Sequence, residues 1–252
     1  MSVLALLLLA LGTSDAVRSR AWGDRGRAHL VTVLAGLSVL VVMAVLAGLS
    51  TLADVALLVL AGAVLVGWVF TSAEEAVRER GAAVPLSVLG LGAASLMLLS
   101  GWATPAGGSV ARWLAWSAVP DVSGLHPNRA LLLAGLLLVQ FATGNVIVRL
   151  VLIQVGALPR AGTPQPSDRL RGGRLLGPME RVIILGLGLA GEVTAASLVI
   201  AAKGLIRWPE LRQADDVPPG SVGVDEVTEY FLVGSMVSWL VALTALAVAL
   251  LG

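Results

Sequence analysis

The stretch HLVTVLAGLSVLVVMAVLAGLSTLADVALLVLAGAVLVGWVF, residues 29–70, is apolar over about twice the length of a membrane-spanning helix. An α-helix rises about 1.5 Å per residue, so about 20 apolar residues cross the roughly 30 Å hydrocarbon core of a bilayer. The polar residues Thr51 and Asp54 lie near the middle of the stretch. The stretch therefore predicts a helical hairpin, with membrane-spanning helices over about 29–49 and 53–72.

The composition of the whole chain is that of a membrane protein. Of its 252 residues, 57% are hydrophobic and 13% are charged, whereas soluble domains are about 45–50% apolar and about 25% charged. Cysteine is absent, which excludes a disulfide framework, an iron–sulfur cluster and a thiol nucleophile. Further apolar segments follow at about 83–103, 129–157, 178–206 and 227–251. The predicted fold is all-α, a single integral membrane domain over 1–252 built as a polytopic transmembrane helical bundle of six or seven spans.

The N-terminal segment, about residues 2–17, is apolar but short, and three interpretations are open. A cleaved signal peptide would have basic residues before Leu4 and a small-residue cleavage site, and both are missing. A re-entrant helix fits the length of the segment. A short first span fits the distribution of charge along the rest of the chain.

Arginine and lysine are distributed unequally between the predicted loops. In a seven-span topology, segments 12–28, 73–82 and 158–181 lie on one side and hold eleven of these residues, against five on the other side. Basic loops stay in the cytoplasm, so the N-terminus is predicted outside, the C-terminus in the cytoplasm and 158–177 as a cytoplasmic linker. The strong preference for Arg over Lys in an Ala-, Gly-, Leu- and Val-rich chain suggests a bacterial inner membrane protein.

The segment ILGLGLAGE, residues 184–192, contains the pattern Gly186-x-Gly188-x-x-Gly191, which is typical of dinucleotide-binding loops. Such a loop needs a strand before it, a helix after it and a parallel sheet around it. Here the glycines lie inside an apolar run, where an exposed turn would leave backbone groups unpaired in lipid. We interpret the motif as a helix-packing surface, in which Gly186 and Ala190 form a small-xxx-small pair next to the other glycines.

Polar residues in two predicted spans indicate one intramembrane cluster, Glu192 with Asn145 and Arg149. At 1.5 Å per residue, Glu192 lies about 21 Å from the cytoplasmic end of its span, Asn145 about 18 Å and Arg149 about 12 Å. Asn145 and Arg149 are four residues apart and share a helix face. The cluster is either a buried clasp that fixes helix register or a site that handles protons, ions or a polar substrate.

Four further charged residues fall near the ends of the predicted 178–206 span. Glu180 and Arg181 are expected at its cytoplasmic mouth, solvated or interfacial. Lys203 and Arg207 are expected at its outer end. On this interpretation the two pairs stand on opposite sides of the membrane.

The sequence contains no recognisable catalytic or metal-binding motif. Its two histidines, His29 and His126, are far apart, which argues against a zinc or haem site. Nothing in the sequence cradles phosphate or indicates nucleic-acid binding. We therefore expect no enzyme activity, no cofactor, no metal and no nucleic-acid partner.

The C-terminal half, about residues 144–242, resembles a bacterial integral membrane family catalogued as domain of unknown function family 3307. The resemblance rests on GNVIVRLVL, GPMERVIIL, AAKGLIRWPEL and EYFLVGSMVSWLVAL. It implies that the family's polar positions are occupied here by Asn145, Arg149, Glu180, Arg181, Lys203 and Arg207. The family often has glutamine in place of Glu192, and an aspartate in its first helix is matched by Asp15. The resemblance implies no reaction.

Two functions agree with these observations. The first is a non-enzymatic membrane component that packs with a partner protein, with the Arg-rich linker as a contact for that partner or for the lipid bilayer. The alternative is a small carrier or an ion- or proton-handling protein that uses Glu192, Asn145 and Arg149. An intramembrane enzyme is disfavoured because histidines, cysteines and paired acids are missing.

Overall fold

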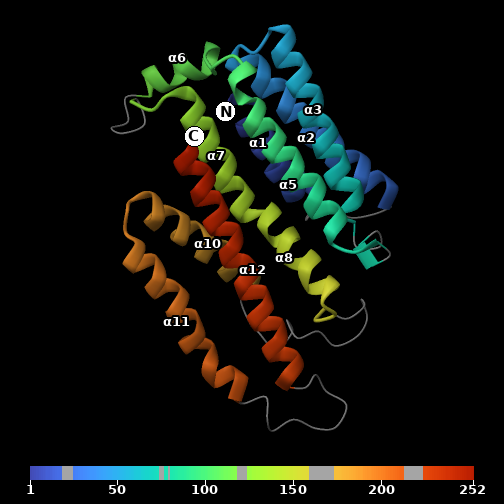
Figure 1. Ribbon diagram of the computed structural model, residues 1–252, viewed down its shortest axis with the longest axis vertical. Helices are drawn as coiled ribbons and strands as arrows, with labels where there is room; N and C mark the ends of the chain where they lie inside the picture. Colours follow the sequence, from blue (N-terminus) through green and yellow to red (C-terminus); the bar gives the residue numbers. More distant parts are fainter. Residues whose placement is uncertain (19–24, 74–76, 79, 118–123, 159–172, 213–223) are drawn as a thin grey trace.

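The computed structural model describes residues 1–18, 25–73, 77–78, 80–117, 124–158, 173–212 and 224–252 (Figure 1). In this part of the chain every regular element is a helix, which confirms the all-α prediction. The elements are α1 (Ser2–Arg18), α2 (Arg25–Ala47), α3 (Leu52–Thr71), α5 (Ala83–Leu98), the 3-10 helix η1 (Leu99–Trp102), α6 (Gly108–Trp116), α7 (Pro127–Phe141), α8 (Thr143–Gln154), α10 (Gly173–Leu189), α11 (Val193–Arg212) and α12 (Val224–Leu251).

Among the described residues, four helices are long and apolar enough to cross a membrane. They cover Ala28–Ala47, Leu52–Thr71, Ala83–Trp102 and Thr228–Leu251. Helices α7 and α8 form a fifth span if this pair, which is bent by 43°, is taken as one crossing. The prediction of six or seven spans was therefore too high. The difference arises at the 2–17 and 178–206 segments.

The hairpin predicted from residues 29–70 is present as α2 and α3. Helix α3 begins with a capping box, in which the Thr51 hydroxyl accepts a hydrogen bond from the Asp54 amide and the Asp54 carboxylate accepts one from the Thr51 amide. The same carboxylate accepts hydrogen bonds from the Thr104 amide and the Thr104 hydroxyl, both at 2.8 Å. The buried Asp54 carboxylate thus accepts hydrogen bonds from both Thr51 and Thr104, and it joins the start of α3 to the segment after η1.

Helix α1 lies in the centre of the bundle, packed against α2, α3 and α7 (Figure 1). It is apolar on all sides and its leucines are almost fully covered by protein, as expected for a helix without a polar face. Glycines allow a close approach to α7: a Cβ atom at Gly12 would lie 2.6 Å from Leu138 Cγ, and one at Gly135 would lie 2.9 Å from Leu8 Cβ. A segment of 17 residues therefore serves as the core of the bundle.

The 178–206 segment forms two helices, which corrects the prediction of one continuous span. Helix α10 ends at Leu189 and α11 begins at Val193. Between them Gly191 has φ +80°, a left-handed conformation that glycine adopts without a steric penalty. The chain reverses at this turn, and α11 runs back along α10 at the edge of the bundle (Figure 1).

This reversal places both chain ends at the same end of the bundle (Figure 1). A Cβ atom at Gly252 would lie 3.5 Å from Met1 Cγ. The predicted arrangement, with the N-terminus outside and the C-terminus in the cytoplasm, assumed seven crossings, and the turn at Gly191 returns one of those segments to its starting side. Which end of the bundle faces outside stays a prediction. Most of the predicted linker 158–177 lies outside the described residues.

Candidate intramembrane polar site

The bend between α7 and α8 exposes a backbone carbonyl to a side chain from another helix. In an uninterrupted helix the Gln140 carbonyl would accept a hydrogen bond from the amide of residue 144. Here it accepts two from the guanidinium of Arg181 in α10, from Nε at 3.0 Å and from Nη2 at 2.7 Å. A positive charge at the C-terminal end of α7 is also favoured by the helix dipole.

Arg181 joins four helices in the interior of the bundle. Its residue surface is only 2% exposed. Nη1 donates to Ser238 Oγ in α12 at 3.1 Å, and Nη2 donates to Asn145 Oδ1 in α8 at 2.6 Å. A Cβ atom at Gly144 would lie 2.8 Å from Arg181 Nε, so the guanidinium fits here because residue 144 has no side chain. The group forms a polar clasp between α7, α8, α10 and α12.

The clasp corrects the prediction that Glu180 and Arg181 are solvated at a helix mouth. Both residues are buried, Glu180 at 7% and Arg181 at 2% exposure. The predicted span began at residue 178, but α10 begins at Gly173. Arg181 therefore lies about 12 Å inside the helix at 1.5 Å per residue.

Lys203 and Glu180, which were predicted on opposite sides of the membrane, form an ion pair. Lys203 Nζ lies 2.5 Å from Glu180 Oε2, and both side chains are about a tenth exposed. The reversal at Gly191 brings the two positions together. Arg207 belongs to α11, and its side chain lies outside the described residues.

The predicted cluster of Glu192 with Asn145 and Arg149 is not assembled. Glu192 is exposed in the turn between α10 and α11, where its backbone amide donates to the Leu187 carbonyl. Asn145 instead accepts from Arg181 and donates from Nδ2 to the Phe141 carbonyl at 3.1 Å. The prediction placed Glu192 at mid-membrane because it assumed one continuous helix. Since the helix ends at Leu189, Glu192 lies in the turn instead.

The glycine motif divides into two roles. A Cβ atom at Gly188 would lie 2.5 Å from Leu246 Cδ2 in α12, so this glycine permits the predicted close packing. Gly186 has no neighbour within 4 Å of an added Cβ atom, and Ala190 is exposed. Gly191 forms the turn. Of the predicted packing surface, the structure places only Gly188 against another helix of the described chain.

A second polar group surrounds Asp15, which sequence reasoning connected only with the family resemblance. The Asp15 side chain is fully buried. Trp68 Nε1, from α3, donates to both carboxylate oxygens, at 3.1 and 3.3 Å. Arg18 Nε lies 4.0 Å from Oδ1, and Arg18 Nη1 donates to Ser72 Oγ at 2.8 Å. The spacing of Asp15 and Arg18 at the end of an apolar helix was the sequence signal for this group.

The Asp15 group extends to the bend between α7 and α8. The Thr143 side chain, at the start of α8, faces the Asp15 carboxylate. Thr143 Oγ1 and Gln140 Oε1 are both buried, and neither has a hydrogen-bond partner of normal geometry within the described part of the chain. A buried polar atom without a partner costs about 1–3 kcal/mol. The bend therefore carries one unpartnered amide oxygen, Gln140 Oε1, and a threonine hydroxyl that faces a buried acid.

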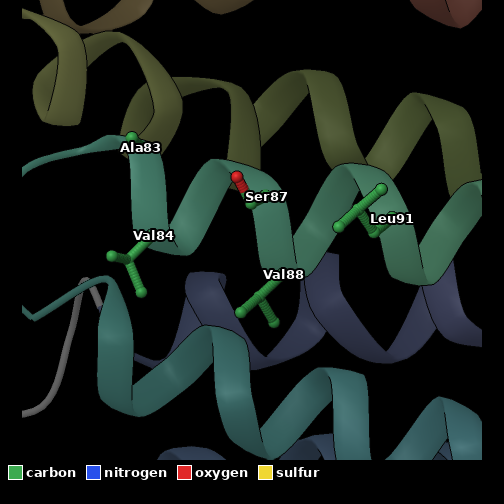
Figure 2. Close-up of a pocket in the computed structure, with 5 residues that line it drawn as sticks. All are labelled: Ala83, Val84, Ser87, Val88 and Leu91. Atoms are coloured by element: carbon green, nitrogen blue, oxygen red, sulfur yellow. The ribbon is translucent and has the colours of Figure 1, made fainter.

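The surface hollow on α5 has a different character. It is lined by Ala83, Val84, Ser87, Val88 and Leu91, all along one helix, with the Ser87 hydroxyl as its polar side-chain group (Figure 2). Within the described ranges, no three His, Cys, Asp or Glu side chains gather as metal ligands would. The polar groups at Asp15 and at the bend are thus the candidate functional site.

No family model, curated protein or solved structure matches this chain. The resemblance described from the sequence stays a prediction.

Proposed function

We propose that this chain is a multi-pass membrane protein of the carrier type that handles protons through Asp15. The observation that carries the proposal is a fully buried carboxylate beside a bent helix whose polar atoms lack partners. Ionisable residues inside a membrane bundle are costly and are retained mainly for function. Discontinuous helices near the bilayer midplane are typical of the binding sites of carriers.

The depth of the site supports this proposal. Asp15 lies thirteen residues after Ser2, or about 20 Å along α1. The bend at Ala142 follows the fifteen residues of α7 and precedes the twelve of α8, so it lies about 20 Å from either end of the pair. Asp15 also lies one turn before Arg18, the last residue of α1, whose side chain is 22% exposed, so the buried carboxyl is separated from the surface on that side by a single charged residue.

The experiment is proton flux into liposomes that contain the purified protein and a pH-sensitive dye. We expect Asp15→Asn to abolish the flux that the wild type produces under a pH gradient, because an amide does not exchange a proton in this way. Glu192→Gln is the matched control, since it neutralises an exposed acid, and it should leave the flux unchanged. Wild-type flux in the Asp15→Asn protein would contradict the proposal.

The second candidate is a membrane component that packs with a partner protein. It is favoured by the hydrogen bonds of Arg181. Each of its guanidinium nitrogens donates to a group of this chain, in Gln140, Asn145 or Ser238, so the clasp has a structural role. Purification of the tagged protein from its own membranes in mild detergent, followed by mass spectrometry, tests it. A stoichiometric protein partner would favour this candidate over the carrier.

We also propose a bacterial inner membrane location with both chain ends outside. The segments between α1 and α2, α3 and α5, α8 and α10, and α11 and α12 join helix ends that lie away from the chain termini (Figure 1). Six of the sixteen arginines lie in these segments, and five more, Arg18, Arg25, Arg27, Arg174 and Arg212, lie at the helix ends that the segments join. Basic segments are retained in the cytoplasm, so the end of the bundle with Met1 and Gly252 would face outward.

A further inference from the structure

We infer that α6 lies in the headgroup region of the lipid bilayer and holds one end of the bundle at that depth. This inference does not depend on proton handling by Asp15, and it rests only on the membrane location of the bundle. The observation that supports it is a short helix across the end of the bundle (Figure 1), whose outward face carries two tryptophans and an arginine.

The start of α6 is fixed to the end of α2 and to α7. The Gly107 amide donates to the Ala47 carbonyl at 2.8 Å. Gly108 has φ +55°, and an added Cβ atom there would lie 2.7 Å from a carbonyl oxygen of α2. Just before α6, the Ala106 amide donates to Asn128 Oδ1 in α7 at 2.7 Å. These contacts hold α6 at one level relative to the two helices.

That level is where the apolar spans end. The candidate span Ala28–Ala47 ends at the carbonyl that accepts from Gly107. The candidate span Ala83–Trp102 ends a short segment, residues 103–107, before α6. The hydrocarbon of a bilayer ends where such spans end, and the headgroup region follows. Trp102 is itself exposed, and tryptophan is enriched at this boundary.

The side chains of α6 divide between two faces. Leu114 is buried and Val110 packs against the core, on the side of α6 that contacts α2 and α7. Trp113 and Trp116 are three residues apart and are both exposed. Arg112, four residues before Trp116, is exposed as well. Because residues three or four apart share a helix face, the outward face combines two indoles with one guanidinium.

This outward face has the chemistry of a helix that lies on a membrane. In water, the two indoles would leave a large apolar surface uncovered, whereas in the interface their rings enter the boundary between acyl chains and headgroups. Their N–H groups can donate to headgroup oxygens there. Arg112 Nη2 donates to Ser109 Oγ at 3.0 Å, and the exposed guanidinium has further donors for a lipid phosphate. The partner of α6 is therefore the phospholipid headgroup region.

The test measures how deep α6 lies, with one spin label at a time, in lipid nanodiscs. The natural chain has no cysteine, so labels are placed by Ala115→Cys on α6, Leu91→Cys in the middle of a candidate span and Arg80→Cys just before α5, all at exposed positions. Collisions with oxygen report the hydrocarbon, and collisions with a water-soluble nickel chelate report water. We expect the α6 label to meet the chelate severalfold less often than the label at 80, and to meet oxygen less often than the label at 91.

The outcomes of this measurement are distinct. An α6 label that matches the label at 80 in both collision rates would place α6 in water and overturn the inference. Protection of the α6 label from both reagents would show that a second copy or another protein covers α6, which also overturns it. Free collision of the label at 91 with the chelate would instead overturn the membrane location on which the inference rests.

The two tryptophans can be tested with the same label on α6. Trp113→Ser with Trp116→Ser removes both rings but keeps Leu114, which packs α6 on the bundle, so the collision rate with the chelate should rise severalfold. Trp102→Ser is the matched control, because it removes an exposed indole outside α6, and it should leave the rate nearly unchanged. An unchanged rate in the double variant would overturn the role of the two indoles.

Discussion

Lys203 and Glu180 are joined by an ion pair of 2.5 Å across a separation of 23 positions in the sequence. The pair holds α11 against α10 in the hairpin that turns at Gly191. Largely buried charged groups are tolerated when each neutralises the other. The pair is therefore a polar contact that helps to fix the outer helix of the hairpin to the inner one.

Removal of one member of this pair should destabilise the protein strongly. Glu180→Gln or Lys203→Met alone is expected to cost about 2–4 kcal/mol, because each leaves a largely buried charge without its counterion. The double variant should recover much of this loss. Thermal unfolding of the four proteins in detergent forms a double-mutant cycle, and additive losses would show that the pair contributes no coupling.

A side chain at residue 144 should disturb the Arg181 clasp. Gly144→Ala places a Cβ atom 2.8 Å from Arg181 Nε and 3.0 Å from its Cζ, and overpacking of this kind costs about 1–3 kcal/mol. Gly186→Ala is the matched control, because an added Cβ atom there meets nothing within 4 Å. Equal melting temperatures for the two variants would contradict the observed approach of the guanidinium to α8.

The indole of Trp68 should stabilise the ionised form of the Asp15 group. Trp68→Phe removes the Nε1 donor to the carboxylate, and hydrogen bonds to charged groups contribute about 1.5–3 kcal/mol. Trp116→Phe, at a residue that is 79% exposed, controls for the loss of an indole. In thermal unfolding in detergent at neutral pH, Trp68→Phe should be less stable than Trp116→Phe. This difference in stability should become smaller in acid, where the carboxyl is neutral.

Labelling of single cysteines can determine the orientation of the bundle. Because the chain contains no cysteine of its own, Gly124→Cys and Arg80→Cys each provide one reactive thiol at an exposed position. An impermeant maleimide added to intact spheroplasts should label the first and should label the second only after lysis. The reverse pattern would place the chain ends in the cytoplasm.

The sequence predicted those parts of the fold that depend on apolar length alone. The α2–α3 hairpin follows from a stretch too long for one crossing, with Thr51 and Asp54 at its turn. The turn at Gly191 has a weaker signal, because Glu192 and Thr194 are isolated polar residues in a run that is otherwise as apolar as a helix interior. One glycine at φ +80° divides a run that periodicity describes as continuous.

The site depends on contacts that sequence spacing does not contain. Arg181 was assigned to a helix mouth because the start of α10 was placed at residue 178 rather than at Gly173. The burial of Asp15 depends on Trp68 from α3 and on α8 covering α1. Asn145 was predicted to pair with Glu192, but its partner is Arg181.

The central position of α1 has a consequence for the order of biosynthesis. The ribosome makes this helix before the other described helices, yet α7, against which Gly12 and Leu8 pack, begins only at Pro127. Until α7 is made, α1 lies in the membrane or in the insertion machinery with the surface that packs against α7 still uncovered. In nascent chains arrested before α7 is made, a cysteine at Leu8 should react with a membrane-permeant maleimide, and in the full-length chain it should be protected. The helix at the centre of this bundle is thus enclosed only after a helix made much later has been added.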